Sequence, residues 1–131
     1  MRINQVKTEL TQGFPGVDIK ETTVSDAGVV TELVGEFDRS LIGSERDVAI
    51  VVADKSDEHM HRIITEEYQV IKGSLKVYRN GELTRLEEGE TIIIEPGTWH
   101  WVEGEETWFY CFSTPDWFPG DFYPRLPASS E

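Results

Sequence analysis

Apolar residues come in short runs along this chain, and turn residues interrupt them about every 8 to 12 positions. The runs at residues 46–53 and 91–94 are rich in β-branched side chains, which indicates buried strands rather than helices. Residues 66–72 alternate, so that successive side chains face opposite sides of a strand. Residues 1–16 show no clear period, and nowhere does the pattern predict an amphipathic helix of about three turns.

The clearest local unit is a hairpin at residues 75–86, where two β-like runs flank Asn80 and Gly81. Asn-Gly favours a two-residue hairpin turn because both turn positions need a positive φ. The segments 100–102 and 107–112 are predicted to be the last strands. Many short strands joined by turns predict an all-β barrel or sandwich.

We expect residues 1–131 to form a single domain, because a chain of this length can bury one core. The barrel itself is expected over about residues 30–114. Residues 115–131 are a different kind of segment, rich in proline and aromatic side chains. We expect this tail to pack on the barrel or on a second subunit.

The charge and the cysteine content exclude several classes of protein. A formal net charge of −13 disfavours nucleic acid and anionic membranes as partners, because phosphate binding needs a positive surface. No apolar run approaches the length that spans a bilayer. Cys111 is the only cysteine, so an intrachain disulfide is excluded and a reducing compartment is favoured. The first residues lack the apolar run of a secretory signal, and a cytoplasmic location is expected.

All three histidines fall in two segments that could share a cavity. His59 and His61 are separated by one residue, so both face the same side of a strand. His100 follows a Pro-Gly turn that can return it to the same cavity. Glu66 and Glu67 come shortly after the pair, and unbroken alternation would put Glu67 on the histidine face. Two imidazoles and a carboxylate on one face predict a site for a divalent metal.

These segments also carry a resemblance to a known family. The first resembles motif one of the cupin superfamily, in the pattern His59-x-His61-x4-Glu66-x6-Gly73. The second is similar to motif two of that family, in the pattern Gly89-x5-Glu95-Pro96-Gly97-x2-His100. Three positions depart from the family pattern, and they hold Ala53, Glu95 and Gly104. None of the three is a metal ligand in the family, so the departures concern the shape of loops.

The resemblance implies a double-stranded β-helix, or jelly roll, with a divalent metal held by His59, His61, Glu66 and His100. Such a set suits iron, manganese, zinc, nickel or cobalt and does not choose among them. Two positions of an octahedron would stay open for substrate or water. The motif spacing selects Glu66 over Glu67, which requires a bend or bulge after His61 to shift the alternation.

The sequence leaves the reaction open. One reading is an isomerase acting on a small polar molecule such as a sugar or sugar phosphate; an iron-dependent dioxygenase and a non-catalytic ligand-binding cupin are the alternatives. No catalytic residue is assigned, but the hydroxyls of Tyr68 and Tyr110 are weak candidates for an acid or an orienting group. A homodimer is expected, because the aromatic tail offers more apolar surface than one small barrel should expose.

Overall fold

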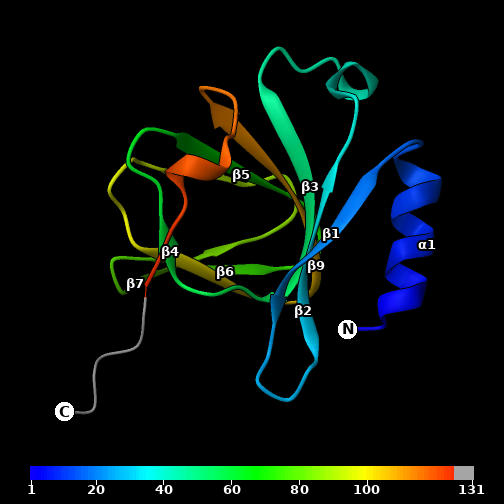
Figure 1. The fold of residues 1–131 in the computed structure, drawn as a ribbon, viewed down its shortest axis with the longest axis horizontal. Helices are drawn as coiled ribbons and strands as arrows, with labels where there is room; N and C mark the ends of the chain where they lie inside the picture. Colours follow the sequence, from blue (N-terminus) through cyan, green and yellow to red (C-terminus); the bar gives the residue numbers. More distant parts are fainter. Residues whose placement is uncertain (126–131) are drawn as a thin grey trace.

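The computed structural model describes residues 1–125 (Figure 1). Over that range the chain forms one α-helix, two short 3-10 helices and a ten-stranded sheet. The elements in chain order are α1 (Ile3–Gly13), β1 (Asp18–Val24), β2 (Val30–Glu36), η1 (Arg39–Ile42), β3 (Asp47–Lys55), β4 (His59–Met60), β5 (Thr65–Lys72), β6 (Leu75–Arg79), β7 (Glu82–Leu86), β8 (Thr91–Ile94), β9 (His100–Thr114), η2 (Pro119–Asp121) and β10 (Tyr123–Pro124).

Strand β9 is the strand of the barrel wall that connects most of the other strands. It pairs antiparallel with β3 and with β5, and its first half pairs with β6. At His100 it also pairs with His59 of β4, which brings the two histidine segments together. The sheet curls so that β5 and β6 lie across the interior from β1, β2 and β3 (Figure 1). The predicted all-β jelly-roll barrel is confirmed.

The helix α1 was not predicted, and the expectation that no three-turn amphipathic helix exists is wrong. Its 11 residues place Val6 and Leu10 one turn apart, and both are fully buried. They pack with Leu33 of β2 and Ile50 of β3, on the outer side of the sheet (Figure 1). The helix has no side-chain N-cap and no acidic residue in its first turn, so the usual start signals are missing.

The turn chemistry agrees with the prediction at the hairpin. Asn80 and Gly81 both have positive φ, 49° and 81°, and they join β6 to β7. The two last strands predicted at residues 100–102 and 107–112 are instead one strand, β9. An irregularity at Glu106, with φ 45°, lies where the gap between them was expected.

The interior core supports the cavity described below. Val51, Tyr68 and Phe109 belong to the buried cluster inside the barrel and also line the cavity. Each buried apolar side chain of this size stabilises the fold by about 1.5–3 kcal/mol. This part of the cavity wall therefore belongs to the core of the barrel.

Residues 115–125 of the expected tail pack on the barrel. Strand β10 pairs with β4, and η2 lies just before it. The remaining residues, 126–131, fall outside the part of the chain that the structure describes. Among residues 1–125, no helix has both the length and the apolar character needed to cross a bilayer.

Candidate metal centre

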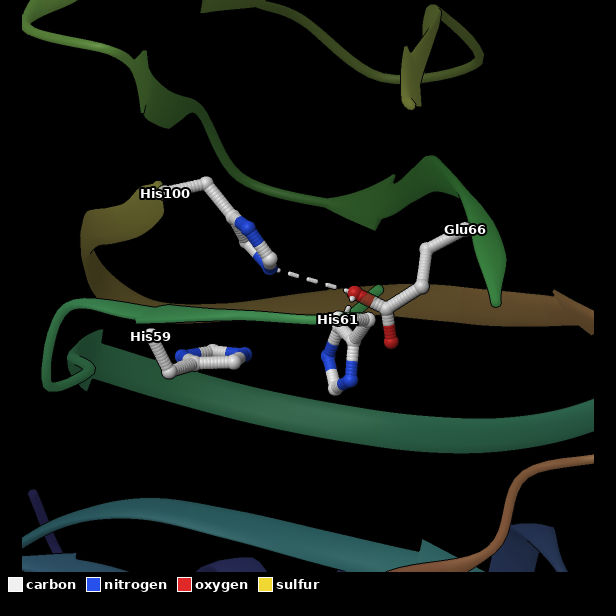
Figure 2. Close-up of side chains that lie close together, drawn as sticks. All are labelled: His59, His61, Glu66 and His100. Atoms are coloured by element: carbon white, nitrogen blue, oxygen red, sulfur yellow. Dashed lines mark hydrogen bonds and ion pairs between the residues drawn. The ribbon is translucent and has the colours of Figure 1, made fainter. Parts of the chain in front are cut away.

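Four side chains from different parts of the barrel converge on one point (Figure 2). They are the four expected ligands, His59 of β4, His61 just after β4, Glu66 of β5 and His100 of β9. A ligand atom from each lies within 4.8 Å of a ligand atom from every other. Three of the four are buried, with exposed fractions of 3% for His61, 5% for Glu66 and 0% for His100.

The backbone fixes the tautomer of all three imidazoles. Each Nδ1 lies 2.8 to 2.9 Å from a carbonyl oxygen, and the pairs are His59 with Asp57, His61 with Asp121 and His100 with Thr98. A carbonyl oxygen only accepts hydrogen bonds, so each Nδ1 carries the proton and donates it. Each Nε2 is left with its lone pair, which is the form that binds a metal.

The donor set fits a divalent cation. Nε2 of His61 is buried without a hydrogen-bond partner among the described residues, and a buried polar atom of this kind needs one. Oε1 of Glu66 lies 3.3 Å from that nitrogen and 3.2 Å from Nε2 of His100. Two ligand atoms that bind one ion at about 2.1 Å and at right angles lie about 3 Å apart, close to these separations.

The charges in the cluster are strongly coupled. Burial, and after it the neighbouring His100, lower the pKa of His59 to about 4. Burial alone would raise the pKa of Glu66, but the electrostatic interaction with the nearby imidazoles of His100 and His61 holds it well below its usual range. Burial acts to lower the pKa of His61, and the interaction with Glu66 outweighs it and raises that pKa. The carboxylate is therefore ionised and His59 is neutral at neutral pH.

The chain bends between the histidine pair and the glutamates, as the motif spacing requires. Strand β4 ends at Met60 and β5 begins at Thr65, so the alternation starts afresh. Glu66 then points into the barrel and is buried, whereas Glu67 is on the opposite face and pairs with Arg46. Of the two carboxylates that the sequence left as rivals, the structure brings Glu66 to the histidines.

A cavity of about 380 Å³ opens beside the cluster and is lined in part by His59, His61 and Glu66. Tyr68 lines it as well, and its hydroxyl donates to Oε1 of Glu66 at 3.3 Å. Burial and the charge of Glu66 raise the pKa of Tyr68 well above its usual value, so this hydroxyl keeps its proton. Of the two tyrosines named from the sequence, this is the one at the site.

Tyr110 lies elsewhere. Its ring packs against Phe14 and Phe37 in the outer cluster under α1, and it does not line the cavity. The next residue, Cys111, takes the inward position, and its thiol donates to Oε2 of Glu66 at 3.1 Å. Burial and then the charge of Glu66 raise the pKa of this thiol well above its usual value. Cys111 is therefore a protonated hydrogen-bond donor to the cluster.

Sequence reasoning missed two groups of the site. Glu32 of β2 lines the cavity, and its Oε1 accepts hydrogen bonds from Thr22 at 2.8 Å and Thr23 at 3.0 Å. Burial raises the pKa of Glu32, although the two threonine bonds partly offset the effect. Asp121 of η2 is the second, because it contacts His61 from the far end of the chain. One acidic residue on a strand and another in a tail give no local signal of either role.

Comparisons with known proteins agree with the geometry. The model of the cupin domain family matches residues 47–109, the stretch that holds all four converging side chains. Residues 47–109 of the chain form a domain of the cupin family. No curated protein matches the sequence.

Several solved structures share the fold. A cupin-2 domain protein from Rhodospirillum rubrum is 15% identical with a TM-score of 0.66, over 89% of this chain and 79% of its own. A nucleoside dehydratase from Streptomyces is 16% identical with a TM-score of 0.63, over 76% of this chain and 82% of its own. The polyketide cyclase RemF from Streptomyces resistomycificus is 16% identical with a TM-score of 0.63, over 86% and 82%. At these identities the likeness establishes the fold.

Proposed function

We propose that this cupin is a metal-dependent enzyme that moves a proton on a small uncharged organic molecule, such as a sugar, bound in the cavity. The observation that carries the proposal is a pair of carboxylates in opposite environments. Glu66 lies among imidazoles, which keep its carboxylate ionised. Glu32 accepts hydrogen bonds from two threonine hydroxyls, and burial raises its pKa. Two carboxylates whose pKa values are pushed apart in one cavity are typical of acid–base catalysis.

The residues divide the work between them. A divalent metal on His59, His61, Glu66 and His100 would supply Lewis-acid polarisation of a substrate oxygen. Oε1 of Glu32 is occupied by the threonines, and Oε2 accepts no hydrogen bond from any residue that the structure describes. This oxygen is positioned to remove a proton from the carbon next to the polarised carbonyl.

The proton transfer balances without an outside reagent. As the C–H bond breaks, its electron pair is delocalised onto the carbonyl oxygen and the proton is held at Glu32. Return of that proton to the former carbonyl carbon, while the proton of the neighbouring hydroxyl passes to the former carbonyl oxygen, completes an isomerisation. The tyrosine and thiol beside Glu66 keep that carboxylate oriented. No oxidant or reductant is consumed.

The cavity favours an uncharged substrate over a phosphorylated one. Its lining contains one cation, Lys20, and four carboxylates, namely Glu32, Glu36, Asp47 and Glu66. A phosphate would meet net negative charge there even with a divalent ion bound. Aromatic rings of Phe37, Trp117 and Phe122 also line it and offer faces on which a ring can stack. Of the sugar and sugar phosphate predicted from the sequence, the sugar fits this lining better.

Proton exchange in heavy water tests the proposal. Metal-loaded protein is incubated in D₂O with a panel of aldoses and ketoses, and ¹H NMR follows deuterium incorporation at the carbon next to the carbonyl. We expect metal-dependent exchange that Glu32→Gln reduces by about 100-fold or more while metal binding is retained. Glu21→Gln on the neighbouring strand β1 is the matched control and should exchange like the wild type. Exchange that survives Glu32→Gln would refute the assigned proton transfer.

The alternatives predict different results from the same preparation. Uptake of oxygen with iron, and no deuterium incorporation, would favour the dioxygenase. Full metal loading without turnover across the panel would favour a non-catalytic ligand-binding cupin. The nucleoside dehydratase and the polyketide cyclase among the structural neighbours are enzymes by name, but the proposal rests on the cavity residues of this chain.

We also propose a homodimer. Trp117, Phe118 and Phe122 of the tail are exposed by 42%, 37% and 44%, and apolar rings grouped within six residues favour association. Light scattering of the purified protein should give twice the mass of one chain. A monomer at all concentrations would refute this part of the proposal.

A further inference from the structure

The side chain of Asp121 is tied to a loop about sixty residues earlier in the chain. It is 1% exposed, and its carboxylate accepts hydrogen bonds from the backbone N–H groups of Arg62, Ile63 and Ile64. The distances are 2.9 Å to Arg62, 3.1 Å to Ile63 and 2.8 Å to Ile64. Three successive N–H groups around one carboxylate form a backbone anion nest, here filled by the protein itself.

Arg62, Ile63 and Ile64, which Asp121 holds in this way, lie where the alternation of side chains between the two faces of the strand is interrupted. The loop of residues 61–64 lies between β4 and β5, and its shape decides whether Glu66 or Glu67 faces the histidines. Without the carboxylate of Asp121, three backbone N–H groups would lose their acceptor. Two of these hydrogen bonds are partly buried and the third, from Ile64, is buried. A buried N–H group that loses its acceptor destabilises the conformation that buries it.

The backbone of Asp121 contacts one of the four converging side chains directly. Its carbonyl oxygen accepts a hydrogen bond from Nδ1–H of His61 at 2.8 Å, which leaves Nε2 facing Glu66. The adjacent ring of Phe122 stacks on the imidazole of His59, with centroids 5.0 Å apart and planes inclined by 25°. Two of the three imidazoles are thus held from outside by consecutive residues of the tail.

Other contacts fasten the same segment, which we call the C-terminal strap and define as residues 115–125. The backbone N–H of Trp117 donates to Asp47 at 2.9 Å, and β10 pairs with β4, where Tyr123 lies opposite Met60. The strap therefore runs from the rim of the cavity to the strand that carries His59. Its removal would open the site on that side.

We infer that Asp121 is a positioning residue of the metal centre, and that docking of the C-terminal strap and binding of the metal stabilise each other. The inference rests on the metal-binding part of the proposed function and not on the reaction. Because coupling between two events is reciprocal, a loose strap must weaken the metal site, and a bound metal must hold the strap.

Affinity for cobalt(II) alone, measured by competition with a chromophoric chelator, tests the first half. We expect Asp121→Ala to weaken cobalt binding by about 10- to 100-fold, as for other outer partners of ligand histidines. Asp121→Asn keeps one oxygen acceptor and should therefore lose less affinity for cobalt than Asp121→Ala. Asp116→Asn is the matched control, since Asp116 lies in the same strap with a side chain that is 75% exposed. Among residues 1–125, that side chain forms an ion pair with Arg39 alone. Equal affinity for the wild type and Asp121→Ala would overturn the inference.

A second readout needs no metal. In ¹⁵N-labelled metal-free protein at alkaline pH, His61 should be the Nδ1–H tautomer in the wild type. Asp121→Ala should give a mixture of tautomers at His61 but leave His100 unchanged, because His100 donates to Thr98. If the wild type binds no cobalt, the metal site fails, and the tautomer comparison still decides the positioning role.

Proteolysis tests the second half without Asp121→Ala, and so it applies even if that variant does not fold. Chymotrypsin cleavage after Trp117 or Phe122, followed by mass spectrometry, should be at least several-fold slower in saturating cobalt than in chelator. In the His61→Ala variant, the rate of strap cleavage should not change when cobalt is added. A wild-type strap that is cut equally fast with and without the metal would overturn the coupling.

Discussion

Glu67 turns away from the three histidines and pairs with Arg46, whose Nη1 lies 2.8 Å from its Oε1. Its neighbour Glu66 is buried against His61 and His100. One step along a strand reverses the face of a side chain, so only one of the two carboxylates can belong to the cluster.

Exchanging each glutamate for glutamine should separate their roles. Glu66→Gln removes the anionic ligand atom and should weaken zinc binding by more than about 10-fold, at least as much as the loss of an outer partner. Glu67→Gln breaks only a half-exposed ion pair, so its affinity should equal that of the wild type. Competition with a fluorescent chelator measures both variants. The opposite order of affinities would mean that Glu67 is the ligand.

Removal of the metal should lower the stability of the protein. A ligand that binds only the folded state stabilises it by about 2.7 kcal/mol when present at 100 times its Kd. The melting temperature should therefore rise when each candidate metal is added to protein stripped with a chelator. We also expect metal to co-purify with the wild type, and His61→Ala should abolish both this metal and the rise in melting temperature. A variant that keeps both would contradict the site.

Acid should destabilise the metal-free protein through His59. The pKa of His59 is about 4 in the fold and 6.5 in the unfolded chain, so between these values the unfolded state binds more protons. Stability therefore falls as pH drops through that window, by about 3 kcal/mol for the whole shift. The raised pKa of His61 acts in the opposite sense, since its contribution is lost as pH rises through the folded value.

A variant isolates the contribution of His59. Urea unfolding in chelator, at a series of pH values from 7 to 4, gives the free energy of unfolding of the wild type and of His59→Gln. The difference between the two curves should change across the window, because only the wild type has this titrating group. A difference that stays constant would show that His59 is not held neutral by the fold.

The sequence predicted what depends on local pattern. The spacing of His59, His61 and Glu66 identified the converging side chains, and Asn80 with Gly81 identified a hairpin, because neighbours in sequence determine both features. Asp121 could not be found in this way, since its partners at residues 62–64 lie about sixty positions away and any acidic residue in the tail looks the same. Glu32 was missed for a related reason, because curling of the sheet decides that it faces the cavity.

The helix α1 is a different kind of omission, because its pattern is present but short. Val6 and Leu10 are one turn apart, with Phe14 one turn further, yet the segment has no cap to mark where a helix begins. Its stability must come from packing on the sheet rather than from intrinsic propensity, as for most helices of about three turns.

Truncation of the helix contact tests that explanation. Leu10 is fully buried against the outer side of the sheet, so Leu10→Ala should lower the free energy of unfolding by about 2–5 kcal/mol. Gln12→Ala on the exposed side of the same helix is the control and should change it by less than about 0.5 kcal/mol. Urea unfolding measures both. Zinc affinity of the folded Leu10→Ala protein should stay at the wild-type value, because α1 packs outside the barrel and the four ligands lie inside. A loss of affinity would show that the outer cluster also positions the site.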